Sequence, residues 1–92
     1  MTKISMDVSE MRALQKKIIE LQNSIQRITR LTNTKIYGMA PHWQSTSANI
    51  FFDQYNEAAG MFSEIAELLG ELATELNSDI DNWEDMAQHL SS

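Results

Sequence analysis

The stretch PHWQSTSANIFF, residues 41–52, decides the fold because it interrupts a chain that is otherwise patterned as helix. Its proline is the only one in the sequence, and Pro41 disfavours helical geometry at the residue before it. The hydroxyl residues Ser45 to Ser47 can cap a new helix, because a side-chain oxygen accepts a hydrogen bond from an unpaired first-turn amide. The stretch therefore predicts a corner at about 39–46, where one helix ends and another begins.

Before the corner, apolar side chains recur in alternating steps of three and four, which is the spacing of one side of a helix. Asp7 can accept hydrogen bonds from first-turn amides, and Glu10, three residues later, can complete a capping box. We therefore expect a first helix at about 8–38. Its apolar seam comprises Met11, Leu14, Ile18, Leu21, Ile25 and Ile28.

After the corner the same pattern continues for longer, with a second apolar row beside the first. One partner helix in a hairpin cannot cover a stripe of this width. We expect a second helix at about 46–88, antiparallel to the first because the connection is short. The predicted fold is an all-α antiparallel hairpin, a single domain over residues 1–92, which dimerises into a four-helix bundle. The predicted dimer or partner interface comprises Phe51, Phe52, Tyr55, Ala59, Phe62, Ile65 and Leu69.

The charges divide at the corner. The chain has 92 residues and a net charge of −6, and all seven lysines and arginines precede residue 44 together with three of the thirteen acids. The first part thus carries +4, and the second part, with the other ten acids, carries −10. Because the basic residues are dispersed along a helix rather than clustered, we interpret the division as two halves that face each other.

The end of the second helix is predicted to extend past the start of the first. In an antiparallel pair that turns near residue 42, residue 8 lies opposite about residues 76–80. The acidic tail at about 81–92 then has no first-helix partner and no basic residue nearby, yet apolar residues keep helical spacing there. We expect an end that frays in isolation and serves export or partner recognition. Its candidate recognition residues are Ile80, Trp83, Met86 and Leu90.

No catalytic constellation is visible in the sequence. The three glycines are isolated, no G-x-S-x-G elbow frames a serine, and there is no cysteine. Asp81, Asp85 and His89 share one helix face and could bind a divalent cation weakly, but a solvated acidic tail is the better interpretation. We therefore expect no enzyme activity, no catalytic or metal site and no cofactor.

Several kinds of partner are disfavoured by composition. Nucleic-acid binding requires a basic surface, and no lysine or arginine follows Lys35. No apolar run approaches the ~20 residues of a membrane-spanning helix, and the basic residues do not line a face opposite the apolar one. The N-terminus has no apolar core of a signal peptide, so any export must use a route that tolerates a folded, unprocessed protein.

The corner motif carries a family resemblance. Trp43, Gln44 and Ser45, followed by Ala48 and Phe51, resemble the corner of the WXG-motif proteins, which are small helical hairpins similar to the early secretory antigen of mycobacteria. The resemblance covers nearly the whole chain. It implies an ESX-like, virulence-associated substrate of type VII secretion that is cytoplasmic before export and then secreted without a cleavable signal peptide. It further implies a non-catalytic binding or adaptor module that forms a homodimer, or a heterodimer with another helical hairpin, and that engages the secretion machinery.

Two departures from the family pattern leave alternatives open. Ser45 stands where the family has glycine, and the Y-x-x-x-D/E export motif is absent because Pro41 and Ala59 follow Tyr37 and Tyr55 at that spacing. A targeting partner or chaperone that pairs with the helical N-terminal domain of a larger secreted toxin is therefore an alternative, as is a cytosolic helical adaptor. Trp43 itself either plugs the end of the helix pair or serves as an exposed anchor for binding.

Overall fold

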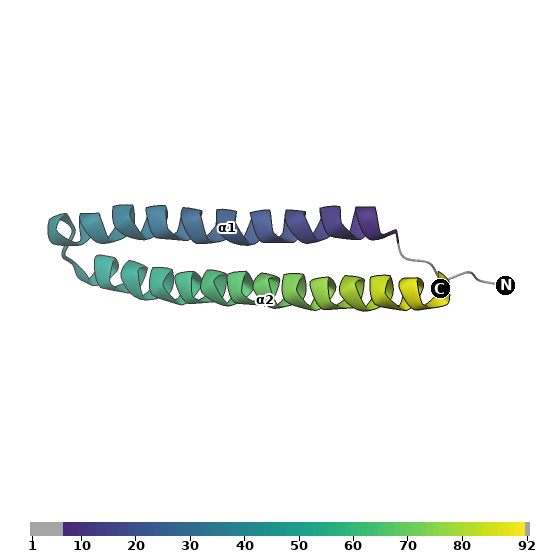
Figure 1. Ribbon diagram of the computed structural model, residues 1–92. Helices are drawn as coiled ribbons and strands as arrows, with labels where there is room; N and C mark the ends of the chain where they lie inside the picture. Colours follow the sequence, from purple (N-terminus) through teal and green to yellow (C-terminus); the bar gives the residue numbers. More distant parts are fainter. Residues whose placement is uncertain (1–6, 92) are drawn as a thin grey trace.

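The computed structural model describes residues 7–91 and shows two long helices side by side (Figure 1). Helix α1 spans Val8–Met39, a single 3-10 turn η1 spans Ala40–His42, and helix α2 spans Thr46–Ser91. The helices run antiparallel and form a rod of 70 × 23 × 16 Å. The described residues contain no strand, and the prediction of an all-α antiparallel hairpin is confirmed.

Local sequence signals set where each helix begins. The Asp7 side chain accepts a hydrogen bond from the Glu10 amide at 3.1 Å, which satisfies a donor that the first turn of α1 leaves unpaired. The Ser45 hydroxyl accepts from the Ala48 amide at 3.1 Å and does the same for α2. Pro41 lies in the first turn of η1, where its missing N–H removes no helical hydrogen bond.

Small side chains on α2 determine how the two helices pack. The fully buried residues are three alanines, Ala48, Ala66 and Ala73, together with Ile80. Ala66, Ala73 and Ile80 recur every seven residues, so they form one row that faces α1. No residue of α1 is fully buried. The hairpin therefore brings its helices together without enclosing a core of large side chains.

Near the middle of the rod, glutamine side chains of α1 reach across to α2. Gln22 Nε2 donates to the Ala66 carbonyl at 2.9 Å, and Gln15 Nε2 donates to Asn77 Oδ1 at 3.1 Å. Gly70 provides the space for Gln22, since a Cβ at this glycine would lie 2.5 Å from Gln22 Nε2. These polar contacts fix the register of the two helices where apolar contacts are sparse.

Toward the corner, two tyrosine–asparagine pairs cross the interface in opposite directions. The Tyr37 hydroxyl of α1 donates to Asn56 Oδ1 of α2, and the Tyr55 hydroxyl of α2 donates to Asn33 Oδ1 of α1. The two tyrosine rings pack edge to face with centroids 6.0 Å apart. The corner half of the rod is thus held in register from both helices.

The apolar seam expected on α1 does not all face α2. Met11, Ile18 and Ile25 are half-buried, but the alternate seam residues remain about half exposed. The reason is that Gln15 and Gln22 turn toward α2 to make their hydrogen bonds, and this rotation of α1 leaves the preceding residues outside. The exposed seam residues are Leu14 (49%), Leu21 (51%) and Ile28 (56%).

Two glycine substitutions test the contact between Gln22 and α2. Gly60→Ala is expected to stabilise the hairpin by about 1 kcal/mol, because alanine is the better helix former and a Cβ at Gly60 meets no atom within 4 Å. Gly70→Ala is expected to stabilise less or not at all, because its Cβ displaces Gln22 and breaks the hydrogen bond to Ala66. Urea unfolding of the two variants measures the difference, and equal stabilisation would show that the Gln22 contact contributes nothing.

Candidate interaction surface

Many of the large apolar side chains that remain exposed lie on one face of the hairpin. On α1, Leu14 and Leu21 each come directly before a glutamine that contacts α2. On α2, Ile65 and Leu72 come directly before the buried Ala66 and Ala73. Because the helices are antiparallel, residues one position before the contacting residues lie on the same face of the pair in both helices. We call this set the apolar face; its members are Leu14, Leu21, Ile28, Phe51, Met61, Phe62, Ile65, Leu68 and Leu72.

A shallow hollow lies between the helices on the side of the apolar face. It has a volume of about 190 Å³ and is lined by residues of both helices, among them Ile28 of α1 and Phe62 of α2. Half of the Phe62 side chain is exposed there. The apolar face is therefore indented along the line where the helices meet, which is where side chains of a packed partner helix can insert.

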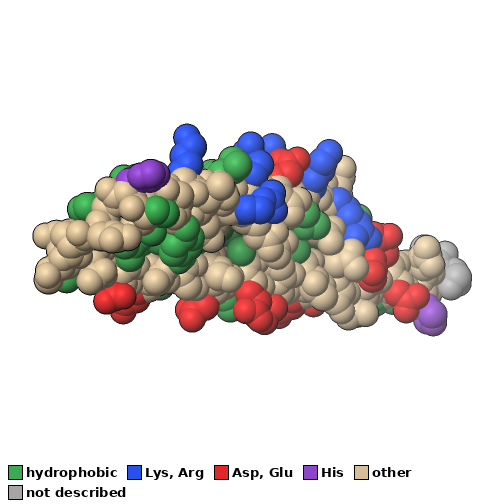
Figure 2. All heavy atoms as spheres, turned by 90° about the vertical axis from the view of Figure 1, so that its left-hand side faces the viewer, with side chains coloured by type: hydrophobic (Ala, Val, Ile, Leu, Met, Phe, Trp, Pro, Cys, Tyr) green, Lys and Arg blue, Asp and Glu red, His purple; other side chains and the backbone are tan. Residues whose placement is uncertain are grey.

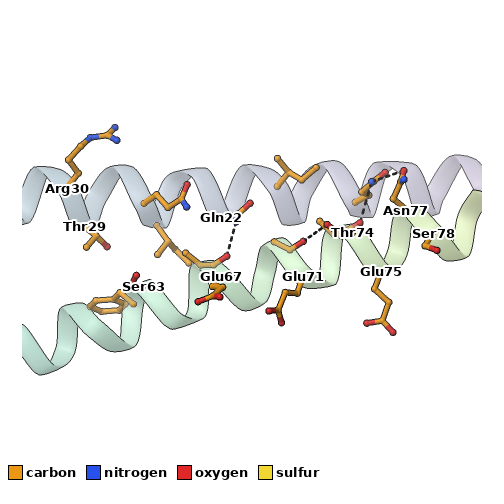
Figure 3. A pocket seen from close by; sticks show the side chains of 18 of the residues that line it. Gln22, Thr29, Arg30, Ser63, Glu67, Glu71, Thr74, Glu75, Asn77 and Ser78 are labelled. Carbon is orange, nitrogen blue, oxygen red and sulfur yellow. Dashed lines mark hydrogen bonds between the residues drawn. The ribbon is translucent and has the colours of Figure 1, made fainter.

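The opposite face is a long polar groove (Figure 3). It encloses about 1620 Å³ along much of the rod, and amide, hydroxyl and carboxylate side chains line most of it. Labelled side chains from both helices border the groove, including Gln22 and Thr29 on α1 and Ser63, Thr74 and Asn77 on α2. Ile19, Ile25 and Phe62 also line this groove, so polar side chains predominate on this face without excluding apolar ones.

Charged side chains occupy the two outer edges. Figure 2 shows lysines and arginines along one edge of the molecule and acids along the other, with hydrophobic side chains between them. The basic edge belongs to α1 and the acidic edge to α2, since all the lysines and arginines precede residue 44 and most of the acids follow it. The apolar face is thus bordered by positive charge on one side and negative charge on the other.

The corner motif forms an aromatic cluster with the start of α2. Trp43 is half-buried, and its ring lies 5.4 Å from that of Phe51 and 5.9 Å from that of Phe52. Ser45 serves as the helix cap, and Gln44 is exposed between the two. The tryptophan therefore contacts the hairpin with part of its surface and presents the remainder at the end of the rod.

The residues predicted for a partner interface divide between the two sides of α2. Phe51, Phe62 and Ile65 are exposed on the apolar face. Phe52 and Ala59 belong instead to the row of Ala66 and face α1. The half-buried remainder of the predicted set is Tyr55, whose hydroxyl binds α1, and Leu69.

The sequence interpretation missed apolar-face residues on both helices. Leu14, Leu21 and Ile28 were assigned to contact within the hairpin, and Met61, Leu68 and Leu72 were not assigned to a partner surface. The spacing of alanines along α2 is the signal that could have identified them. A row of small residues marks the side on which two helices approach closely, so the large residues beside that row must point elsewhere.

The acidic end of α2 is part of the hairpin, contrary to the expectation that it lacks a basic neighbour. Arg12 Nη2 lies 2.8 Å from Asp81 Oδ1 and 3.1 Å from Glu84 Oε1, and Arg12 Nη1 donates to Asn77 at 2.7 Å. The hydrogen bond to Asp81 raises the pKa of Arg12 above its ordinary value. The register differs because the contacts between the helices, such as Asn33 with Tyr55 and Arg12 with Asp81, are centred near residue 45 rather than residue 42, so α1 begins opposite residues beyond 80.

The four candidate recognition residues of this end therefore have different surroundings. Ile80 is completely buried and Trp83 is half-buried, so both belong to the hairpin rather than to a free tail. Met86 and Leu90 remain exposed, Leu90 by 82%. Of the four, Met86 and Leu90 therefore present the most apolar surface that a partner could reach without displacing α1.

Residues 7–91 contain no group of three or more histidine, cysteine, aspartate or glutamate side chains placed to hold a metal ion. Within the same range no helix is both long and apolar enough to cross a membrane. Comparisons with protein-family models, with curated proteins and with solved structures find no match to this chain. The candidate site therefore rests on geometry: an apolar face, its charged edges and the aromatic corner.

Removal of the Arg12 side chain tests whether it holds the end of α2. Arg12→Gln is expected to increase amide hydrogen exchange in residues 81–91, because the ion pairs that join Asp81 and Glu84 to α1 are lost. Lys16→Gln is the matched control, since it removes one positive charge from the same helix at an exposed position. Unchanged exchange in the Arg12 variant would show that apolar packing alone holds this segment.

Proposed function

We propose that this chain is a non-catalytic helical-hairpin module that pairs with another hairpin through its apolar face and is exported by a type VII secretion machine. The pairing part of the proposal rests on the exposed apolar side chains of both helices. The export part rests on the WXG-like corner of Trp43, Gln44 and Ser45, placed between two long antiparallel helices.

The size of the exposed apolar face supports pairing on energetic grounds. Complete burial of one leucine or phenylalanine side chain contributes about 1.5–3 kcal/mol, so covering one that is half exposed contributes about 1 kcal/mol. Over the whole face the gain is about 5–10 kcal/mol, which is comparable to the net stability of a small domain. A second hairpin placed on this face completes a four-helix bundle, in which each helix has two neighbours.

A targeting partner for a larger secreted toxin is the second candidate function. The width of the apolar stripe on α2 favours this function. Met61 and Leu68 add exposed apolar side chains at the outer side of the stripe, so it is wider than one hairpin of the same size covers. The missing Y-x-x-x-D/E motif also favours it, since a heterodimer obtains the export signal from its partner. In this version the apolar face binds the helical N-terminal domain of the toxin.

Export assays test the proposal directly. The tagged protein is expressed in a bacterium with a functional type VII machine and in a matched strain that lacks the secretion ATPase, and culture supernatants are compared. We expect ATPase-dependent export that is lost in Ile65→Asp, because a carboxylate on the apolar face prevents pairing. Ser63→Asp introduces the same charge on the polar groove and should be exported normally.

Trp43→Ala extends the same assay to the corner. Because Trp43 is only half-buried, we expect this variant to keep its helical circular dichroism while its export falls. Export of the wild-type protein in the strain without the ATPase would contradict the type VII route. Secretion that occurs only when a toxin N-terminal domain is co-expressed would select the targeting-partner function.

A further inference from the structure

Pairing through the apolar face leaves the polar groove and the acids of α2 unused. We infer that the polar groove binds a basic α-helix of a partner protein, one that carries lysine or arginine at every third or fourth position along one side. The groove lies on the face opposite the apolar face, so it stays open when the apolar face is covered. The inference therefore holds or fails independently of the pairing proposed above.

Most of the negative charge of α2 is not neutralised within the hairpin. The sequence favoured two oppositely charged halves that face each other, yet in residues 7–91 the lysine and arginine ion pairs that cross between the helices all involve Arg12, at the open end. Elsewhere the acids of α2 lie along one edge of the molecule and the basic residues of α1 along the other (Figure 2). The charge of α2 is thus available to a partner.

Four acids of α2 form one wall of the polar groove. Glu67, Glu71, Glu75 and Asp79 recur every four residues, and all four are exposed and line the groove. None of them forms an ion pair within the part of the chain that the structure describes. Like charges at this spacing repel one another along a helix. A partner that brings cations to this wall relieves the repulsion in addition to forming ion pairs.

Between its walls the groove presents hydrogen-bond acceptors. The Ala66 carbonyl can only accept, so the Gln22 amide nitrogen faces it and Gln22 Oε1 is left to accept from a ligand. Thr74 Oγ1 donates to the Gly70 carbonyl at 3.0 Å, so its lone pairs are likewise left for another donor. Lysine and arginine side chains carry donors and no acceptors. The groove therefore complements basic side chains in hydrogen bonding as well as in charge.

The wall of α1 that faces the carboxylates carries no opposing charge. Gln15 and Ile19 line the groove there, and Ile19 is 39% exposed, which gives the aliphatic stem of a lysine or arginine an apolar contact. Arg30 borders the groove only toward the corner, and its side chain points away from α2 (Figure 3). Cations of the occupant therefore meet the part of the groove between Glu67 and Asp79.

The length and spacing of the acidic wall favour a helix as the occupant. The lining of the groove on α2 runs from Phe62 to Asp79, a rise of about 25 Å at 1.5 Å per residue. Its carboxylates follow one another at intervals of about 6 Å along the axis. Cations at every fourth residue of a helix that lies along the rod have the same interval, so each can meet its own carboxylate. Such a helix also completes a three-helix arrangement, in which each helix packs beside two others.

A model peptide tests the location of binding. The probe is an alanine-based helix of about 18 residues, long enough for the groove, with lysine at every fourth position. In NMR spectra of the labelled protein at low salt, we expect the side-chain amide signals of Gln15, Gln22 and Gln26 to shift, while the methyl signals of Leu21 and Leu72 on the apolar face do not. Shifts confined to those methyl groups, or no shifts at all, would overturn the inference.

A second peptide separates helix recognition from net charge. It has the same composition, but its lysines are distributed around the helix instead of along one side. We expect it to bind more weakly, because only some of its cations can reach the acidic wall at the same time. Equal affinity of the two peptides would show that charge alone attracts them and would overturn the helix as occupant.

Carboxylate substitutions measure the contribution of the acidic wall. Glu71→Gln and Glu75→Gln should each raise the dissociation constant of the first peptide by about two- to fivefold, because each removes one exposed ion pair. Glu64→Gln is the matched control, since it makes the same change at an exposed position of α2 outside the groove, and it should have less effect. Equal weakening in all three variants would overturn the groove as the binding site.

Discussion

The small side chains in the α1-facing row of α2 constrain everything else in this molecule. Ala66 and Ala73 let the helices approach, but they bury little apolar surface when they do so. The large apolar side chains are displaced to the side of this row, where half or more of several of them remains in solvent. A hairpin built in this way has a defined shape without a core of its own, and its apolar face is the consequence.

Polar contacts supply the specificity that apolar packing within the hairpin does not. They occur at intervals along the rod: Arg12 with acids at the open end, Gln15 and Gln22 at the centre, and the tyrosine–asparagine pairs near the corner. Each contact joins residues far apart in the sequence, so together they select one register among those a repetitive apolar pattern permits.

Much of the fold follows from local sequence signals. Pro41, the Ser45 cap and the Asp7 cap act within a few residues of their own position, so they identify the corner and the two helices without knowledge of the rest of the chain. The rotation of α1 is different in kind. The apolar seam of α1 contains two rows of side chains. Which row faces solvent is decided by a contact between residues far apart in the sequence, that of Gln22 with Ala66.

The candidate site was predictable to the same extent. The sequence indicated an apolar stripe on α2 too wide for one helix, and Phe51, Phe62 and Ile65 do lie exposed on it. It could not show that Ile80 is buried, because that depends on the register of the two helices, which is set by contacts across the pair such as that of Arg12 with Asp81. The pattern along one helix shows which residues share a side of that helix, whereas contacts between the two helices determine which side faces the other helix.

The central claim is that one hairpin is half of a folded unit. Thermal unfolding followed by circular dichroism over about a hundredfold range of protein concentration tests it, because association with a second copy makes the melting temperature depend on concentration. If one hairpin is half of a folded unit, the melting temperature rises steadily with concentration, and the most dilute sample unfolds with weak cooperativity. A sharp transition at one temperature throughout the range would show that the single hairpin is stable alone, and would contradict the account.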